Sequence, residues 1–356
     1  MTQSLISVII PAYNHASLIT EAICSVTDQD YPSLELILID DGSSDDTADR
    51  AEDTLKRQKI PFQIVRQPNQ GAHTAINNGI ALARGEWITI LNSDDRFSPF
   101  RIVRLLDHAS RAKSRFVFSR VHYMNQAGFP LPPSAPQNYY YERALESKDL
   151  YPSPNFEFLR HNYAITTGNF FLHHSLTDQI GGFRDLKICH DWDFVLRALL
   201  VEEISFLDEK LYEYRVHPDN TIRPAVNDLR YQEIDMILSN YLRQAETASN
   251  PLAPSYKNWG LYWKLFVRSQ IIFGYLHETA SAIKEITENS TLRRGETLDR
   301  IHYDLLAKAL DVSQRKNILF DEKLTNVQTN LERLANKSLR TILWEKLKKR
   351  LAAHRK

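Results

Sequence analysis

Short apolar runs alternate with amphipathic segments over the first hundred residues of the chain. Each run is four to six residues long, rich in Ile, Leu and Val, and typical of a strand buried on both faces. Between the runs, apolar residues recur at helical spacing, which indicates helices packed on one side. Strands that alternate with helices predict βαβ units, and hence an α/β fold with a mostly parallel sheet flanked by helices. The predicted strands are Leu5–Ile10, Leu34–Ile39, Phe62–Val65 and Trp87–Leu91.

The pattern is less regular after Arg96. A helix is predicted up to about Ala112, and the connection Gln126–Pro154 reads as a long functional or mobile loop. Another helix begins at Asp191, and from about Asn227 a helical pattern runs to the end of the chain. We therefore expect an α/β domain over residues 1–225 and a C-terminal helical region over residues 226–356. Further strands are predicted at Phe116–Phe118, Thr166–Leu172, Ile204–Leu207 and Leu211–Val216.

Acidic residues follow two of the predicted strands. Asp40 and Asp41 end the second strand, and the fourth strand stops at Asn92–Asp95. Ligands of parallel sheets bind at the carboxyl ends of the strands. Adjacent carboxylates there repel each other unless a cation is bound between them. Mg²⁺ or Mn²⁺ is the natural candidate, because hard cations bind carboxylate oxygens and phosphate oxygens at the same time. The alternative is a solvated Asp-Asp turn that caps the next helix.

Composition narrows the class of protein. The 44 Lys and Arg residues balance 44 Asp and Glu residues, so no net charge favours nucleic acid as a partner. Cys24 and Cys189 fit no metal-binding spacing. No signal-peptide pattern is evident and charges interrupt the apolar window Trp259–Leu276, so we expect a cytoplasmic protein without a membrane span. Neither a GxGxxG fingerprint nor a P-loop occurs.

Four ordered motifs define the chain further: SVIIPAYN, LILIDDGSSDDT, PNQGAHTAINNGIALARGEWITILNSDD and GGFRDLKICHDWDFVLR. Together they resemble the family 2 glycosyltransferases of the GT-A fold, over about Ser7 to Arg223. The resemblance implies inverting transfer of a sugar from a nucleotide diphosphate, with a UDP-sugar as the expected donor. The implied acceptor is a hydroxyl of a glycan or lipid-linked molecule, as in cell-surface polysaccharide synthesis. The implied cofactor is Mn²⁺ or Mg²⁺.

The resemblance also assigns a donor site. The loop after the first strand and the second Asp of the strand-two pair would hold the nucleotide base, because a carboxylate accepts a hydrogen bond from a uracil N–H; for that Asp the alternative is a capping turn. Gln70 and Gly71 would bring a helix N-terminus towards the nucleotide. Asp94 would contact the ribose and Asp95 the metal, whereas Asn92 stands where relatives commonly carry an Asp. The base-binding residues so implied are Pro11, Ala12, Tyr13, Asn14 and Asp41.

The acceptor hydroxyl must lose its proton as it attacks, which requires a carboxylate as general base. Asp191 matches the position of that base in the family, with Asp193 as its rival and a helix N-cap as the alternative role for Asp191. Arg215 and His217 resemble a segment near the diphosphate. His217 would ligate the metal, or either residue would clamp the phosphates, with a structural polar role as the alternative for both.

The tail, Lys337–Lys356, combines eight Lys and Arg residues and one acid with an aliphatic face. A basic amphipathic helix of this kind can make peripheral contact with an anionic membrane, or it can pack on its own domain or mediate self-association. A second class of function also remains. A catalytically silent module would bind nucleotide sugar and act as an assembly partner through its helical tail, although Asp95 and Asp191 together argue against it.

Overall fold

A computed structural model describes residues 3–148, 151, 153–218, 220, 227–255, 258, 279 and 281–282. The chain divides into two compact units, residues 1–297 and 298–356, and every described residue belongs to the first. The basic tail Lys337–Lys356 therefore lies outside the described residues, and the expected domain boundary at residue 225 stays a prediction. No helix in the described part is long and apolar enough to cross a membrane.

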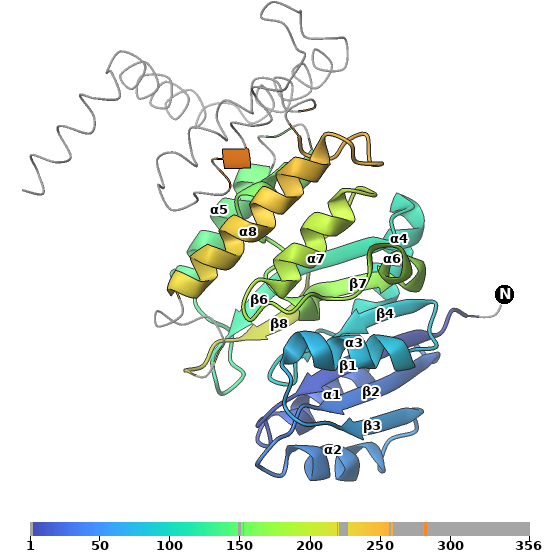
Figure 1. Cartoon of the computed structure of the whole chain (residues 1–356). Helices are drawn as coiled ribbons and strands as arrows, with labels where there is room; N and C mark the ends of the chain where they lie inside the picture. The colour runs from blue at the N-terminus through green and yellow to red at the C-terminus, as the bar shows by residue number, and fades with distance from the viewer. Residues whose placement is uncertain are drawn as a thin grey trace, which may run out of the picture. The chain divides into compact units, whose positions relative to one another are not determined.

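Within the described residues an eight-stranded sheet runs in the order β3-β2-β1-β4-β7-β6-β8-β5 (Figure 1). The pairs β2–β3, β1–β2, β1–β4 and β6–β8 are parallel, whereas β7 is antiparallel to β4 and β6, and β5 is antiparallel to β8. The first half of the sheet thus has the expected parallel arrangement. The strands are β1 (Ile6–Ala12), β2 (Leu34–Asp40), β3 (Phe62–Arg66), β4 (Trp87–Ile90), β5 (Arg96–Phe97), β6 (Phe116–Met124), β7 (Phe170–His173) and β8 (Ser205–Arg215).

Helices flank this sheet, and α8 lies along α7 (Figure 1). The α-helices are α1 (Ile19–Thr27), α2 (Thr47–Leu55), α3 (Ala72–Leu82), α4 (Arg101–Ala112), α5 (Pro136–Lys148), α6 (His174–Ile180), α7 (His190–Leu199) and α8 (Asn227–Ala245). Two 3-10 helices, η1 (Pro154–Leu159) and η2 (Thr167–Asn169), precede β7. The α/β architecture predicted from the alternation of apolar runs is confirmed.

Two local predictions were wrong. The segment expected to be a loop contains α5, which buries Tyr141, Ala144 and Leu145 at helical spacing. Its proline, Pro136, occupies the first helical position, where a missing N–H costs nothing. The two short strands expected between residues 204 and 216 form the single strand β8, because shifts in its register with β6 absorb the polar residues between them.

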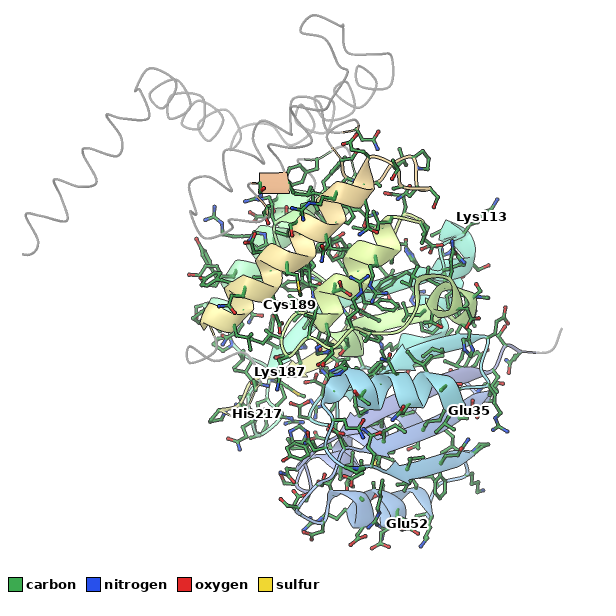
Figure 2. The ribbon with its side chains drawn as sticks, viewed as in Figure 1. Glu35, Glu52, Lys113, Lys187, Cys189 and His217 are labelled. Carbon is green, nitrogen blue, oxygen red and sulfur yellow. The ribbon has the colours of Figure 1, made fainter. Side chains whose placement is uncertain are left out.

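Apolar side chains dominate the centre of the parallel half. All residues of β2 and β4 are buried, and so are Ile6–Ile10 of β1. One polar cluster closes the amino edge of these strands. Glu35 accepts hydrogen bonds from Ser7 Oγ at 2.6 Å and Arg84 N at 2.8 Å, while Ser7 Oγ accepts from Gly85 N at 2.9 Å. Figure 2 shows Glu35 at the end of the sheet opposite His217, so this cluster leaves the carboxyl edge for chemistry.

Substitution of Gly85 tests how tightly the amino edge is packed. A Cβ atom added there would lie 2.6 Å from Ser7 N and 2.7 Å from Trp87 O. Because backbone atoms of two central strands cannot move aside easily, we expect Gly85→Ala to lower the free energy of unfolding by about 1–3 kcal/mol, measured by urea denaturation. Ala81→Gly on the exposed side of α3 is the control and should cost about 1 kcal/mol or less. A Gly85→Ala protein as stable as the wild type would contradict this packing.

Candidate active site

The loops after β1 and β2 are joined at the carboxyl edge of the sheet. Pro11 and Ala12 end β1, and Ala12 O accepts from Asp41 N at 2.8 Å. Asn14 has a φ of 53°, which Asn tolerates better than most residues. Its Oδ1 accepts from Ser44 N at 2.8 Å. These contacts hold the loop in place and leave the Tyr13 side chain 47% exposed.

The Asp41 carboxylate connects β2 to the start of α3. Its Oδ1 accepts from Gln67 Nε2 at 2.7 Å and from Gln70 N at 2.9 Å, and its Oδ2 accepts from Gly71 N at 2.8 Å. Gln70 and Gly71 precede Ala72, the first residue of α3, so Asp41 holds the loop that leads into this helix and does not cap the helix itself. A carboxylate oxygen has two lone pairs, so Oδ2 retains an acceptor for a further donor.

Asp95 faces the protein interior and is only 1% exposed. Its Oδ1 accepts from Arg215 N at 2.7 Å, and its Oδ2 accepts from Tyr212 Oη at 2.7 Å and Asn92 Nδ2 at 3.0 Å. Burial, and then the charge of Asp94, raise the pKa of Asp95 well above its ordinary value. This geometry does not fit the expected metal contact of Asp95. It also explains Asn92, because an ionised Asp at that position has no proton to donate to Asp95.

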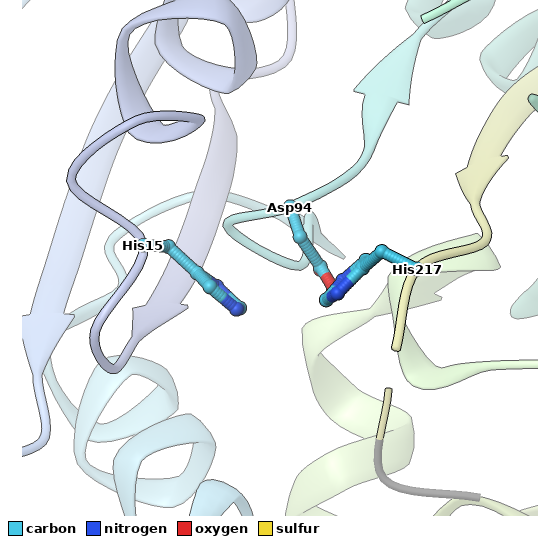
Figure 3. A group of neighbouring side chains, drawn as sticks. All are labelled: His15, Asp94 and His217. Carbon is cyan, nitrogen blue, oxygen red and sulfur yellow. The ribbon is translucent and has the colours of Figure 1, made fainter. Parts of the chain in front are cut away.

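Asp94 turns the other way and meets two histidines (Figure 3). One ligand atom from each of Asp94, His15 and His217 lies within 4.8 Å of the other two. Asp94 Oδ2 is 2.9 Å from His217 Nε2, and His15 Nδ1 is 2.7 Å from Ser93 Oγ. Two imidazoles and a carboxylate form a donor set that suits a transition-metal ion such as Mn²⁺. His15 was missed from sequence, where only its place directly after PAYN pointed to it.

Arg215 holds the backbone next to this cluster and is only 1% exposed. Its Nε donates to Asp94 O at 2.7 Å, its Nη1 to Gln126 O at 2.9 Å and its Nη2 to Glu21 Oε2 at 2.6 Å. The guanidinium thus fixes the backbone that carries Asp94. These contacts correspond to the structural alternative for Arg215 rather than to a phosphate clamp.

Asp191 lies at the start of α7. Its Oδ2 accepts from Asn162 Nδ2 at 2.8 Å and its Oδ1 from Trp192 N at 2.7 Å. Burial raises the pKa of Asp191 to about 7, yet the residue keeps a partly exposed surface. The rival carboxylate, Asp193, is buried and paired with Arg197 at 2.8 Å and Arg184 at 3.2 Å. Asp191 is therefore the carboxylate of this helix that is suited to take up a proton near neutral pH.

Helix α8 holds the segment that leads into α7. The buried Glu233 accepts from Lys187 N at 2.8 Å, Ile188 N at 2.9 Å and Cys189 N at 2.8 Å. Lys187 and Cys189 lie towards the same end of the molecule as His217 (Figure 2). Burial first, and then the charges of the Asp95, Asp94 and Asp191 carboxylates, raise the pKa of Tyr214. The base candidate and the metal-site candidates therefore share one neighbourhood.

Several known proteins resemble this chain in sequence or in fold. Residues 7–181 match the family model of glycosyl transferase family 2. An uncharacterized glycosyltransferase of Rickettsia typhi is 29% identical over 243 residues, which cover 67% of this chain and 72% of that protein. S. aureus TarS 1–349 in complex with UDP-GlcNAc has a similar fold, with a TM-score of 0.51 and 18% identity over 83% of this chain and 95% of that chain. Mannosyltransferase PcManGT from Pyrobaculum calidifontis, in complex with GDP-Man and Mn²⁺, has a TM-score of 0.54 and 17% identity, and the match covers 94% of this chain and 86% of that chain.

The class of protein follows: the fold is that of the GT-A glycosyltransferases. Residues 7–181 belong to glycosyltransferase family 2, and the chain is a transferase. The resemblance drawn from the four sequence motifs is thereby confirmed, and the silent binding module is not favoured.

The Tyr212 hydroxyl is one of three donors to the buried Asp95. Tyr212→Phe removes that donor and leaves a buried carboxylate oxygen less well satisfied. We expect the free energy of unfolding to fall by about 1–3 kcal/mol, measured by chemical denaturation. Tyr214→Phe, two positions along β8, is the control because its hydroxyl is not among the Asp95 donors, and its effect should stay within about 0.5 kcal/mol. Equal losses in both variants would argue against a special role for Tyr212.

Proposed function

We propose that this protein transfers a sugar from a UDP-sugar to a hydroxyl of a glycan or lipid-linked acceptor, with inversion at the anomeric carbon. One observation carries the proposal. Two carboxylates in one neighbourhood have different environments: Asp94 faces two histidines, whereas Asp191 is partly buried and has a pKa of about 7. Carboxylates set apart in this way are suited to separate roles in binding and proton transfer.

The donor site in this proposal lies at the ends of β1 and β2. Asp41 Oδ2 accepts an N–H of the nucleotide base, and the exposed Tyr13 ring is available to stack on it. The UDP-GlcNAc complex of TarS supports a uridine donor, and the GDP-Man complex of PcManGT makes guanosine donors the first competitors to test. A lipid-linked acceptor is consistent with the basic amphipathic pattern of Lys337–Lys356. The same pattern is consistent with a cytoplasmic enzyme in peripheral contact with the membrane. The acceptor and the membrane contact stay predictions.

We infer that Asp94 and His217, rather than Asp95, hold the divalent cation, with His15 beside them. Imidazole nitrogen suits Mn²⁺ better than Mg²⁺, which prefers oxygen ligands. A bound cation would supply stabilisation of the negative charge that develops on the departing diphosphate. Asp95 and Arg215 aim Asp94 at this position through their contacts with β4 and β8. Ser93 fixes the ring of His15 by its contact with Nδ1, which leaves Nε2 for a ligand.

Asp94→Ala and His217→Ala should each weaken Mn²⁺ binding at least tenfold, because each removes a ligand atom. Binding is measured by electron paramagnetic resonance of the unbound Mn²⁺ ion, with and without UDP. Asp53→Ala, an exposed acid on α2, is the control and should bind Mn²⁺ like the wild type. Unchanged Mn²⁺ binding in both site variants would overturn the ligand assignment.

In this proposal Asp191 accepts the proton of the acceptor hydroxyl. Since the active form is the carboxylate, kcat/KM should rise with pH and level off above a midpoint near the pKa of about 7. A midpoint close to the ordinary pKa of an Asp would contradict the assignment. Asp193 stays ion-paired with two arginines and plays no part in this step.

Asp191→Asn removes the proton acceptor and keeps the size of the side chain; no cap is lost, because Cys189 rather than Asp191 is the N-cap residue of α7. We expect kcat and kcat/KM to fall together by roughly 10²–10⁴-fold, while the affinities for UDP and Mn²⁺ stay near those of the wild type. Steady-state kinetics with a UDP-sugar and calorimetric UDP binding measure the two effects. A variant that keeps more than half of the wild-type turnover would exclude Asp191 as the base. Loss of UDP binding would make Asp191 a donor-site residue instead.

A further inference from the structure

We propose that residues 162–167 form a strut between the base and the Asn92–Asp95 turn, in which Asn162 is the positioning residue for Asp191. The inference rests on the proposed role of Asp191 as general base. It assigns a task to a segment that contributes no residue to the expected donor, metal or base positions.

Both ends of the strut contact the site. At one end, Asn162 Nδ2 donates to Asp191 Oδ2 at 2.8 Å. At the other end, Thr166 Oγ1 accepts from Asn92 Nδ2 at 2.8 Å, and Thr167 Oγ1 lies 3.4 Å from Asn92 Oδ1. The amide orientation of Asn162 follows from its partner, because the reverse would set two oxygen atoms against each other. One short segment thus sets the spacing between the start of α7 and the end of β4.

Contacts with buried groups fix the backbone of the strut. Asn169, two residues beyond its far end, is fully buried and donates to Ser119 O at 2.7 Å and to Ala164 O at 3.0 Å. Tyr163, next to Asn162, is 1% exposed, and its ring centroid lies 4.3 Å from that of Phe158. Asn162 therefore starts from an anchored backbone, which is what a residue that orients another side chain needs.

Backbone strain marks the same segment. Ile165 has a φ of 74°, in the left-handed region that β-branched residues avoid because the Cβ atom crowds the backbone carbonyls. Such a conformation persists where the surroundings over-determine it, and it clusters at functional sites. Here the anchors on both sides of Ile165, Asn162–Asp191 and Thr166–Asn92, supply that determination.

The Asn162 contact matters because few other groups around Asp191 favour its ionised form. In the described part of the chain, Asn162 is the one side chain that donates a hydrogen bond to Asp191. The other titratable groups that face Asp191 are Arg230 on α8, Tyr214 on β8 and Cys189 beside it. The positive charge of Arg230 and the Asn162 donor both favour the ionised form. Loss of the donor leaves the buried carboxylate harder to ionise, so its pKa must rise.

The test compares Asn162→Ala with the wild type across a pH profile of kcat/KM. We expect the acid limb to move to higher pH, so that the rate at pH 7 falls at least tenfold and largely recovers at pH 9. Calorimetric affinity for UDP should stay within twofold. Asn162→Ser, which keeps a shorter donor and the polar surface, should show a smaller movement in the same direction and covers the case in which the alanine variant folds poorly.

A double-mutant cycle with Asp191→Asn separates this inference from the proposed function. If Asn162 acts through Asp191, the double variant should be no slower than Asp191→Asn alone. A loss that is equal at every pH and adds fully to that of Asp191→Asn would overturn the positioning role. An active Asp191→Asn enzyme would instead refute the base itself. A slow Asp191→Asn enzyme with an unmoved acid limb in both Asn162 variants would refute only the strut.

Discussion

The candidate site depends on one buried carboxylate, that of Asp95. Two of its three hydrogen bonds, from Tyr212 and Arg215, join the turn after β4 to β8, more than one hundred residues later in the chain, and the third comes from Asn92 within the turn. A carboxylate taken out of water is costly unless each oxygen has donors, so these bonds also define where the Asn92–Asp95 turn must lie. With Asp95 held inward, its neighbour Asp94 is presented outward to His217. The buried residue thus aims the accessible one.

The charge of Asp95 is balanced by a relay of polar groups rather than by direct contact with a cation. Asn92 and Tyr212 contribute neutral donors, and the fully buried Arg101 guanidinium lies 5.3 Å from the centre of the Tyr212 ring. Burial lowers the pKa of Arg101 to about 9, so the guanidinium stays protonated at neutral pH. The absence of an acidic side chain at position 92 is therefore a matter of charge balance: a third carboxylate next to Asp94 and Asp95 would raise the cost of ionising all of them.

The sequence predicts the elements of this site better than the direction in which their side chains point. Apolar runs with abrupt acidic ends located Asp41 and Asp94 because parallel strands deliver their carboxyl ends to one edge, whereas Asp191 was located by its match to the family motif. Whether Asp94 or Asp95 faces inward could not be predicted, since the answer comes from Tyr212 and the Arg215 backbone on a distant strand. Helix α5 was hidden for a different reason. The prolines that break a helix interior are also the residues that begin one.

The environment of Asp191 shows which effect determines its ionisation. It lies in the first turn of α7, where the helix dipole favours a negative charge by about 0.3–1 kcal/mol, less than one pKa unit. The pKa nevertheless rises to about 7, so burial outweighs the dipole, the Trp192 N–H and the Asn162 amide together. Glu233 explains how this arrangement is maintained. By accepting three backbone N–H groups just before α7, it fixes the helix start from α8. Helix α8 therefore supports the start of α7, where Asp191, the proposed base, lies.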